Sequence, residues 1–238
     1  MANPHFQNMI LWAGNTDVTE QKKDQPMFQP YPSDQTFYGY FNDFMTYNSG
    51  DWTVTTTEAG TGSASEAVTS SAGGALLLTN AAGDNDLDFL QLKGEAFRLS
   101  ASKKAYFSAR FKVSDATQSD FVMGLHITDT TPLDVTDGIF FISADGAATL
   151  DFQVEKDNTA TTTSSVATMA NDTFITTSWF IDPDRDALYY SINNGTPLKS
   201  VATNLPNDED LTISFGIQNG EAVAKTMTID YITMMVER

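Results

Sequence analysis

Apolar and polar residues alternate over much of the chain, which is the pattern of β-strands with one buried face. In residues 105–113 (AYFSARFKV) every second residue is apolar. Successive side chains of a strand point to opposite sides, so this run predicts a strand with one face in a core. Short runs rich in β-branched or aromatic residues predict further strands at residues 87–92, 121–127, 139–142, 150–154, 174–181, 188–192, 211–217 and 227–236. No window carries an apolar stripe at helical spacing.

Turn residues between these runs indicate how the strands connect. Asn193-Asn194-Gly195 follows the run at 188–192, and Asn and Gly tolerate the positive φ angles of tight hairpins. Many short strands joined by such turns favour a sandwich of two antiparallel sheets over alternating βαβ units. We therefore predict an all-β domain over residues 46–238. The Thr-, Ser- and Ala-rich residues 53–75 and 159–168 are expected to be exposed loops or edge strands.

Residues 1–45 differ from the rest of the chain. They hold half of the eight prolines and many aromatic residues that follow neither strand nor helix periodicity, so we expect an extended N-terminal arm. Disordered linkers are poor in aromatic residues, so this arm is expected to dock, either on its own domain or on another chain. The candidate partner-binding residues of the arm are Phe6, Trp12, Phe28, Tyr31, Phe37 and Tyr38.

Composition then removes several classes of function. The chain has 13 Lys and Arg against 31 Asp and Glu, a net charge of −18 and no cysteine. Disulfides, thiolate zinc sites and thiol nucleophiles are therefore excluded. Phosphate backbones and anionic membrane surfaces are disfavoured by the charge. No window approaches the roughly 20 apolar residues of a membrane span, and the start of the sequence lacks the features of a signal peptide, so we expect synthesis in the cytoplasm.

Positive charge is not spread evenly over the predicted strands. Five of the 13 basic residues fall within a short stretch, and they are Arg98, Lys103, Lys104, Arg110 and Lys112. The last two share the polar face of the strand at 105–113. Such a patch on an acidic body suits contact with an acidic partner or with a second copy of the chain, and a solvated strand face is the plainer alternative.

The chain from Trp179 onward carries a family resemblance. A strand ends in the hairpin Asn194-Gly195, LTISFGIQN follows, and the final strand contains Ile229-Asp230-Tyr231-Ile232. This succession resembles the closing strands of concanavalin A-like lectin and glucanase jelly rolls, including laminin-G-like members. The resemblance implies a jelly-roll sandwich. The aromatic arm and the acidic, cysteine-free, Thr-rich domain also resemble, in style, the capsid decoration (cement) proteins of tailed bacteriophages.

Many jelly-roll proteins of this kind are glycosidases, which need two carboxyl groups roughly 5 to 9.5 Å apart. Asp151, Gln153 and Glu155 lie on one face of a predicted strand. The two carboxylates are about 13 Å apart at 3.3 Å per residue, and Gln153 stands where the glucanases have a middle acid. We therefore expect a polar, solvent-facing row and no hydrolysis. His126, between Leu125 and Ile127, is expected on a surface or sheet face and not as a catalytic base.

Calcium is the one cofactor that the sequence suggests. Asp182, Asp184 and Asp186 present alternating oxygen donors, as do Asp84, Asp86 and Asp88, and calcium accepts oxygens from such loops. Neither segment has the Gly and Glu positions of an EF-hand, and Asp-rich turns commonly cap their own backbone. The segment 182–186 is the better of the two candidates.

Together these observations predict a non-enzymatic structural protein of a phage virion. It would lie on the capsid exterior as a decoration protein, with its arm on neighbouring subunits of the major capsid protein and with self-association. The alternative is a carbohydrate-binding, lectin-like module of a fibre or adhesin. A polysaccharide-degrading enzyme is the third possibility.

Overall fold

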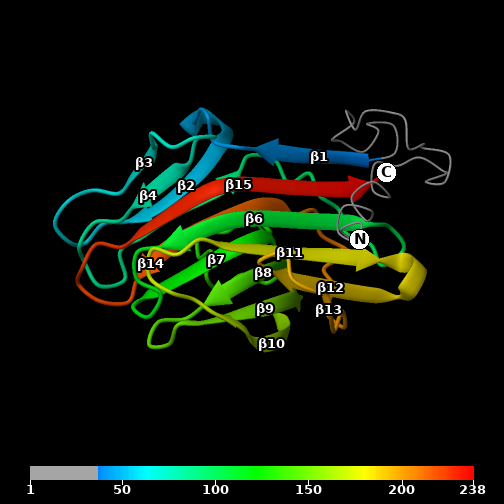
Figure 1. Cartoon of the computed structure of the whole chain (residues 1–238). Helices are drawn as coiled ribbons and strands as arrows, with labels where there is room; N and C mark the ends of the chain where they lie inside the picture. The colour runs from blue at the N-terminus through cyan, green and yellow to red at the C-terminus, as the bar shows by residue number, and fades with distance from the viewer. Residues whose placement is uncertain (1–36) are drawn as a thin grey trace.

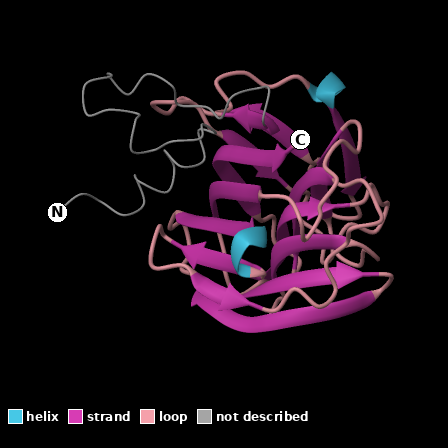
Figure 2. Cartoon of the chain, turned by 90° about the vertical axis from the view of Figure 1, so that its right-hand side faces the viewer, coloured by secondary structure: helices cyan, strands magenta, loops and turns pink. Residues whose placement is uncertain are grey.

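Strands make up most of the computed structural model, which describes residues 37–238 (Figure 1). The strands are β1 Phe37–Asn42, β2 Trp52–Thr57, β3 Ser65–Val68, β4 Leu76–Thr79, β5 Leu87–Leu92, β6 Ala105–Val113, β7 Ser119–His126, β8 Gly138–Ser143, β9 Thr149–Lys156, β10 Thr159–Thr168, β11 Ile175–Asp182, β12 Ala187–Ile192, β13 Leu198–Ser200, β14 Thr212–Asn219 and β15 Thr226–Glu237. Two 3-10 turns, η1 Ser49–Asp51 and η2 Pro183–Arg185, complete the regular structure (Figure 2). No helix among the described residues has the length to cross a membrane.

The strands form two antiparallel sheets. Sheet A has the order β13-β12-β11-β6-β15-β4-β3, with β1 also paired to β15, and sheet B has the order β10-β9-β8-β7-β14-β5-β2. In Figure 1, β1, β15, β6, β11 and β12 form the nearer layer. Long-range pairs such as β6 with β15 and β7 with β14 place segments far apart in sequence side by side. The predicted all-β sandwich is confirmed.

The core lies between the two sheets, where the alternating apolar residues meet. Phe107 of β6 stacks on Trp179 of β11 with ring centroids 5.8 Å apart. Phe152 of sheet B contacts Tyr190 of sheet A at 5.7 Å and Phe141 at 4.9 Å. These rings are buried and join the layers directly, so the core holds both sheets together through large aromatic areas.

Most of the predicted strands are confirmed with small shifts of their ends. The predicted strand 105–113 coincides with β6, and the hairpin residues Asn193 and Asn194 have φ of 51° and 55°. The Thr- and Ser-rich segments supply β2, β3 and β10, which lie at sheet edges as expected. The short strands β4 and β13 were not predicted.

The sandwich begins earlier than residue 46, the boundary expected from the sequence. Phe37–Asn42 forms β1, which pairs with β15 over its whole length, and Phe44 is fully buried in the core. The prolines at 26, 30 and 32 precede this segment, so they do not interrupt it. The boundary at 45 is therefore corrected to a domain that includes residues 37–45.

Candidate functional site

On the outer face of sheet B, several neighbouring strands present polar groups together. Paired residues on neighbouring strands point to the same side. One row consists of Glu155, Gly138, His126 and Thr212. The next row consists of Gln153, Phe140, Gly124, Ser214, Gln91 and Thr53.

Glycines on this face leave room for aromatic side chains. A Cβ on Gly124 would come within 2.5 Å of the Phe140 backbone, and one on Gly216 within 2.4 Å of the Phe89 ring. Phe89 and Phe140 are 0% and 2% exposed although they point away from the main core. The face therefore carries a second, smaller apolar cluster.

Residues 127–137 cover this second cluster. Val135 is 2% exposed and packs with Phe89, Val122 and Phe140, and Leu133 adds to the contact. The Asp129 amide donates to Gln91 Oε1 at 3.2 Å, which ties the segment to β5. The segment thus covers the part of the outer face that holds Phe89, Val122 and Phe140.

His126 lies beneath this covering segment. It is on the sheet face opposite Leu125, as predicted, but it is fully buried, so the expectation of a surface position is wrong. Its Nδ1 lies 2.6 Å from the carbonyl oxygen of Ile127. Burial lowers the pKa of His126 to about 4, although the Ile127 contact opposes this. The ring is therefore neutral near pH 7, with Nδ1 donating and Nε2 without a partner.

The acidic row of β9 lies on one face of the strand as the sequence predicted, but the expectation that it faces solvent is wrong at Glu155, which is 8% exposed. Asp151, Gln153 and Glu155 alternate with Leu150, Phe152 and Val154, which point into the core. Asp151 accepts a hydrogen bond from the Ser165 amide, and Gln153 Nε2 donates to Glu155 Oε2 at 2.8 Å. Burial raises the pKa of Glu155, and the Gln153 hydrogen bond opposes the rise. The row is polar and hydrogen-bonded, and its two acids remain too far apart to act on one glycosidic bond.

The basic cluster divides into two groups at opposite ends of β6. Lys104 precedes the strand and Lys112 is near its end, about 26 Å apart at 3.3 Å per residue. Most of the cluster is paired with aspartates, as in Lys104–Asp184 at 2.8 Å and Lys112–Asp172 at 3.5 Å, and Arg98 and Arg110 pair with Asp210 and Asp230. Lys103 is exposed. The structure does not bring the five residues into one patch, and their contact role stays a prediction.

In the candidate calcium segment, the carboxylates of Asp182 and Asp184 are bonded to neighbouring protein groups. Asp182 is 4% exposed, and its carboxylate accepts hydrogen bonds from the Asp184 amide at 3.1 Å and from Arg185 at 3.0 Å. Asp184 pairs with Lys104, and Asp186 ends η2 in the left-handed conformation. No group of three His, Cys, Asp or Glu residues within 37–238 is placed to hold a metal ion.

The other aspartate segment, 84–88, anchors two loops. Asp86 is fully buried and accepts hydrogen bonds from the amides of Ala59, Gly60 and Gly83 at 2.6 to 2.9 Å. Burial opposes ionisation of Asp86, but these three donors lower its pKa overall. Asn80 and Asn219 continue the network, with Asn80 Nδ2 donating to Asn219 Oδ1 at 3.0 Å.

The predicted arm residues fall into two sets. Phe6, Trp12, Phe28 and Tyr31 lie outside the described residues. Phe37 and Tyr38 belong to β1, where Phe37 is 5% exposed and Tyr38 stacks on Phe97 with centroids 6.1 Å apart. These two residues therefore pack in the sandwich itself, which corrects their assignment to the arm.

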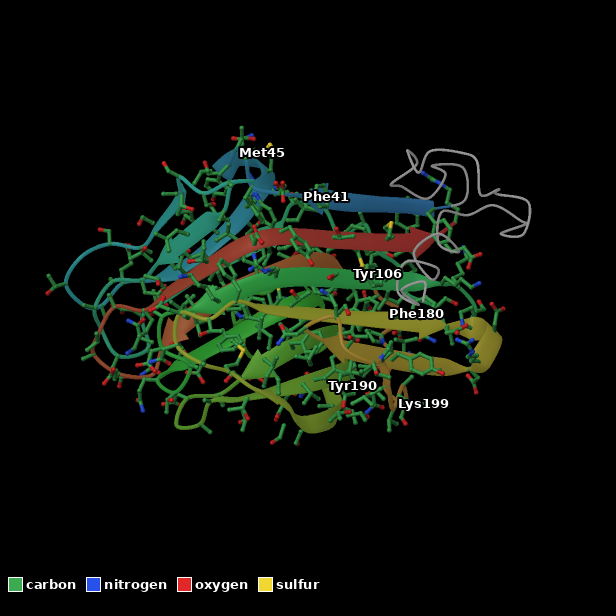
Figure 3. The ribbon with its side chains drawn as sticks, viewed as in Figure 1. Phe41, Met45, Tyr106, Phe180, Tyr190 and Lys199 are labelled. Atoms are coloured by element: carbon green, nitrogen blue, oxygen red, sulfur yellow. The ribbon has the colours of Figure 1, made fainter. Side chains whose placement is uncertain are left out.

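The outer face of sheet A carries a row of three aromatic residues and one methionine, which was not predicted from the sequence. Met235, Tyr106, Phe180 and Tyr189 are paired in succession across β15, β6, β11 and β12, and each is half-buried. Figure 3 shows Tyr106 and Phe180 on neighbouring strands of this layer. Alternation within each strand shows which side chains share a face, but the four residues form one row only through the pairing register between strands, which the sequence does not give.

No family model matches the sequence, and no curated protein matches it. Solved structures do match. A protein of unknown function from Shewanella oneidensis is 16% identical with a TM-score of 0.59, over 100% of this chain and 95% of that one.

Two further matches have named functions. An endo-1,3-β-glucanase from Streptomyces sioyaensis is 12% identical with a TM-score of 0.59, over 84% of this chain and 96% of that one. Peanut lectin is 11% identical with a TM-score of 0.54, over 84% and 97% of the two chains. At these identities the likeness concerns the fold. The described chain is a concanavalin-like jelly roll, as the closing strands suggested.

Proposed function

We propose that this protein is a non-catalytic binding protein whose partners are other proteins, as in the shell of a viral particle. One observation carries the non-catalytic part. On the outer face of sheet B, Val135 and its segment close over Phe89, Val122 and Phe140. A chain-cleaving enzyme with this fold needs that surface open and two carboxyl groups a few ångströms apart across it.

The acids on this face support the same conclusion. Asp151 is engaged by the Ser165 amide and Glu155 by Gln153. Asp137, the last residue of the covering segment, accepts a hydrogen bond from the Asp157 amide at 3.1 Å. Asp151 and Asp137 each hold a neighbouring strand or loop in place, and Glu155 is engaged within its own strand, so all three carboxylates have structural contacts.

A protein partner is supported by the chemistry of the N-terminal sequence. Phe6, Trp12, Phe28 and Tyr31 precede β1 in a segment with four prolines. Aromatic side chains supply large contact area at low entropy cost and dominate protein interfaces. The location on a virion and the major capsid protein as partner belong to this proposal.

Carbohydrate binding is the second candidate, and a specific observation favours it. The fold is shared with peanut lectin, and the half-buried Gln153 and the exposed Thr162 lie beside Glu155 on the outer edge of sheet B. Amide, hydroxyl and carboxylate groups in such a row match the hydroxyls of a sugar.

Three measurements on the full chain distinguish these functions. Reducing-sugar assays with mixed-linkage and 1,3-linked β-glucans are expected to show no product. Mass spectrometry of density-purified viral particles from the source culture is expected to find the protein in stoichiometric amounts. Its absence from such particles, together with selective binding on a glycan array, would replace the protein partner by a glycan. Release of sugars would overturn the non-catalytic assignment.

A further inference from the structure

The two long edges of the sandwich are closed differently. At one edge, Thr163 of β10 and Ser200 of β13 are hydrogen-bonded at 2.9 Å, and Asn204 donates to Thr161 at 2.8 Å. At the other edge, β2 and β3 carry core-facing valines that remain in contact with solvent. Val54 and Val68 are paired with the buried Leu90 and Leu76, yet they are 36% and 40% exposed. We call this the β2/β3 edge.

A fully buried acid lies behind the β2/β3 edge. Asp88 of β5 is paired with Ile217, a core residue, so its side chain points between the sheets. Neither of its carboxylate oxygens has a hydrogen-bond partner among the described residues. The hydroxyl of Tyr47, also buried, has none either. Three buried side-chain oxygens of one small region thus have no hydrogen-bond partner within residues 37–238, although buried polar atoms of native proteins are almost always satisfied.

Further acids surround this region, and no basic residue of the described chain forms an ion pair with them. Glu66 of β3, paired with the buried Leu78, faces Asp88 from the opposite sheet, and Glu58 adds its charge from the β2–β3 connection. Two ionised carboxylates are both acceptors, so Glu66 cannot satisfy Asp88 unless a proton lies between them. None of the ion pairs within residues 37–238 involves Asp88, Glu66 or Glu58.

We propose that the β2/β3 edge binds a primary ammonium group, presented by a lysine side chain of a partner protein. An ammonium group has three donors and no acceptor, which matches Asp88, Glu66 and the Tyr47 hydroxyl. The aliphatic stem of lysine would lie along Val54 and Val68, as such stems do on apolar surfaces. A divalent metal fits less well, because no three acidic or histidine ligands of the described chain are grouped to hold one.

Without the ammonium group, a proton takes its place. Burial, with the Glu66 carboxyl beside it, raises the pKa of Asp88 to about 8, and burial with Glu66 and Asp88 raises that of Tyr47. A ligand cation must displace this proton near pH 7. Binding of the ammonium group therefore depends on pH through the ionisation of Asp88. The charged and titratable groups that face Asp88 are Glu66, Glu58 and Tyr47.

The test uses n-butylammonium chloride as a lysine mimic, titrated into the full, isotopically labelled chain and followed by amide NMR. We expect saturable shifts confined to β3, β5 and residues near Tyr47. The affinity should rise by up to about tenfold per pH unit between pH 6 and 8, as the displaced proton becomes easier to remove. Tetramethylammonium, which has no N–H donor, should produce no such shifts.

Matched variants decide the role of the acids. Asp88→Asn should weaken n-butylammonium binding at least tenfold, whereas Asp151→Asn, the same change on the outer face of sheet B, should leave it unchanged. If Asp88→Asn does not fold, Glu66→Gln replaces it as the test variant in the binding titration. A second measurement follows the carbon-13 shift of the Asp88 carboxyl against pH, and n-butylammonium should lower the midpoint of that titration.

Three results would overturn the proposal: no localised saturable shifts, equal binding by Asp88→Asn, or localised binding of calcium chloride in place of n-butylammonium. The inference rests on the proposed function only for its last step, that the ammonium belongs to a protein. If n-butylammonium binds at this site but the macromolecular partner of the protein proves to be a glycan, the proposed function fails and the ammonium site stands.

Discussion

Among single residues, Asp88 has the largest expected effect on how stability depends on pH. Its pKa is about 8 in the folded protein against an ordinary value of 3.8. The folded state therefore holds a proton that the unfolded state has lost across that interval. The stability contributed by neutral Asp88 is complete below pH 3.8 and is lost as pH rises through 8, at up to about 1.4 kcal/mol per pH unit.

Replacing Asp88 by Asn tests this directly, because the amide resembles the neutral acid and does not ionise. We expect urea unfolding between pH 5 and 9 to show a shallower decline for Asp88→Asn than for the unmodified protein, and greater stability for the variant above pH 8. Parallel curves for the two proteins would contradict a raised pKa at this position.

Asn219 is the other residue whose loss should be costly. Its Nδ2 donates to the carbonyl oxygens of Ala81 and Gly83 at 2.7 and 2.8 Å, and its Oδ1 accepts from Asn80 and the Lys225 amide. Asn219→Ala leaves buried donors and acceptors unpaired, so we expect a loss of about 2–4 kcal/mol in urea unfolding. Gln218→Ala, one residue away and half-exposed, should cost less than about 1 kcal/mol. Similar losses for both variants would contradict the proposed anchoring role.

At the scale of elements, the glycines of sheet B determine how its outer face is built. Gly124 lies under Phe140, and a Cβ there would meet the Ile139 carbonyl oxygen at 2.5 Å. Gly124→Ala must push β7 and β8 apart or displace Phe140, so we expect a loss of about 2–3 kcal/mol. Gly94→Ala has nothing within 4 Å and should cost only the strain of its φ of +88°, about 1 kcal/mol. Thermal unfolding of the two variants makes the comparison, and equal losses would contradict the packing argument.

The elements also show which features were predictable from sequence. β6 was predicted with its correct ends because its period of two is a local property of nine residues. β1 was missed because Phe37, Tyr38, Tyr40 and Phe41 leave no clear alternation, and its partner β15 lies at the other end of the chain. The covering segment 127–137 has the composition of an exposed loop. That Val135 closes over Phe89 depends on contacts between residues far apart in sequence, which periodicity does not encode.

At the scale of the whole molecule, the net charge of −18 is the dominant electrostatic property. Eight ion pairs join the described residues, and most involve exposed side chains, which contribute about 0–1 kcal/mol each. Self-repulsion of an excess of acids destabilises the compact state, and salt screens both this repulsion and the attraction within the ion pairs.

Because repulsion among the many acids exceeds the attraction of these few pairs, sodium chloride should stabilise the protein. We expect the melting temperature to rise by about 3–6 °C between 10 mM and 500 mM salt at pH 7. Calorimetry at several salt concentrations measures the change, with potassium chloride as a control for specific sodium binding. A fall in melting temperature would mean that pairs such as Lys225 with Asp115, whose lysine is 5% exposed, outweigh the repulsion.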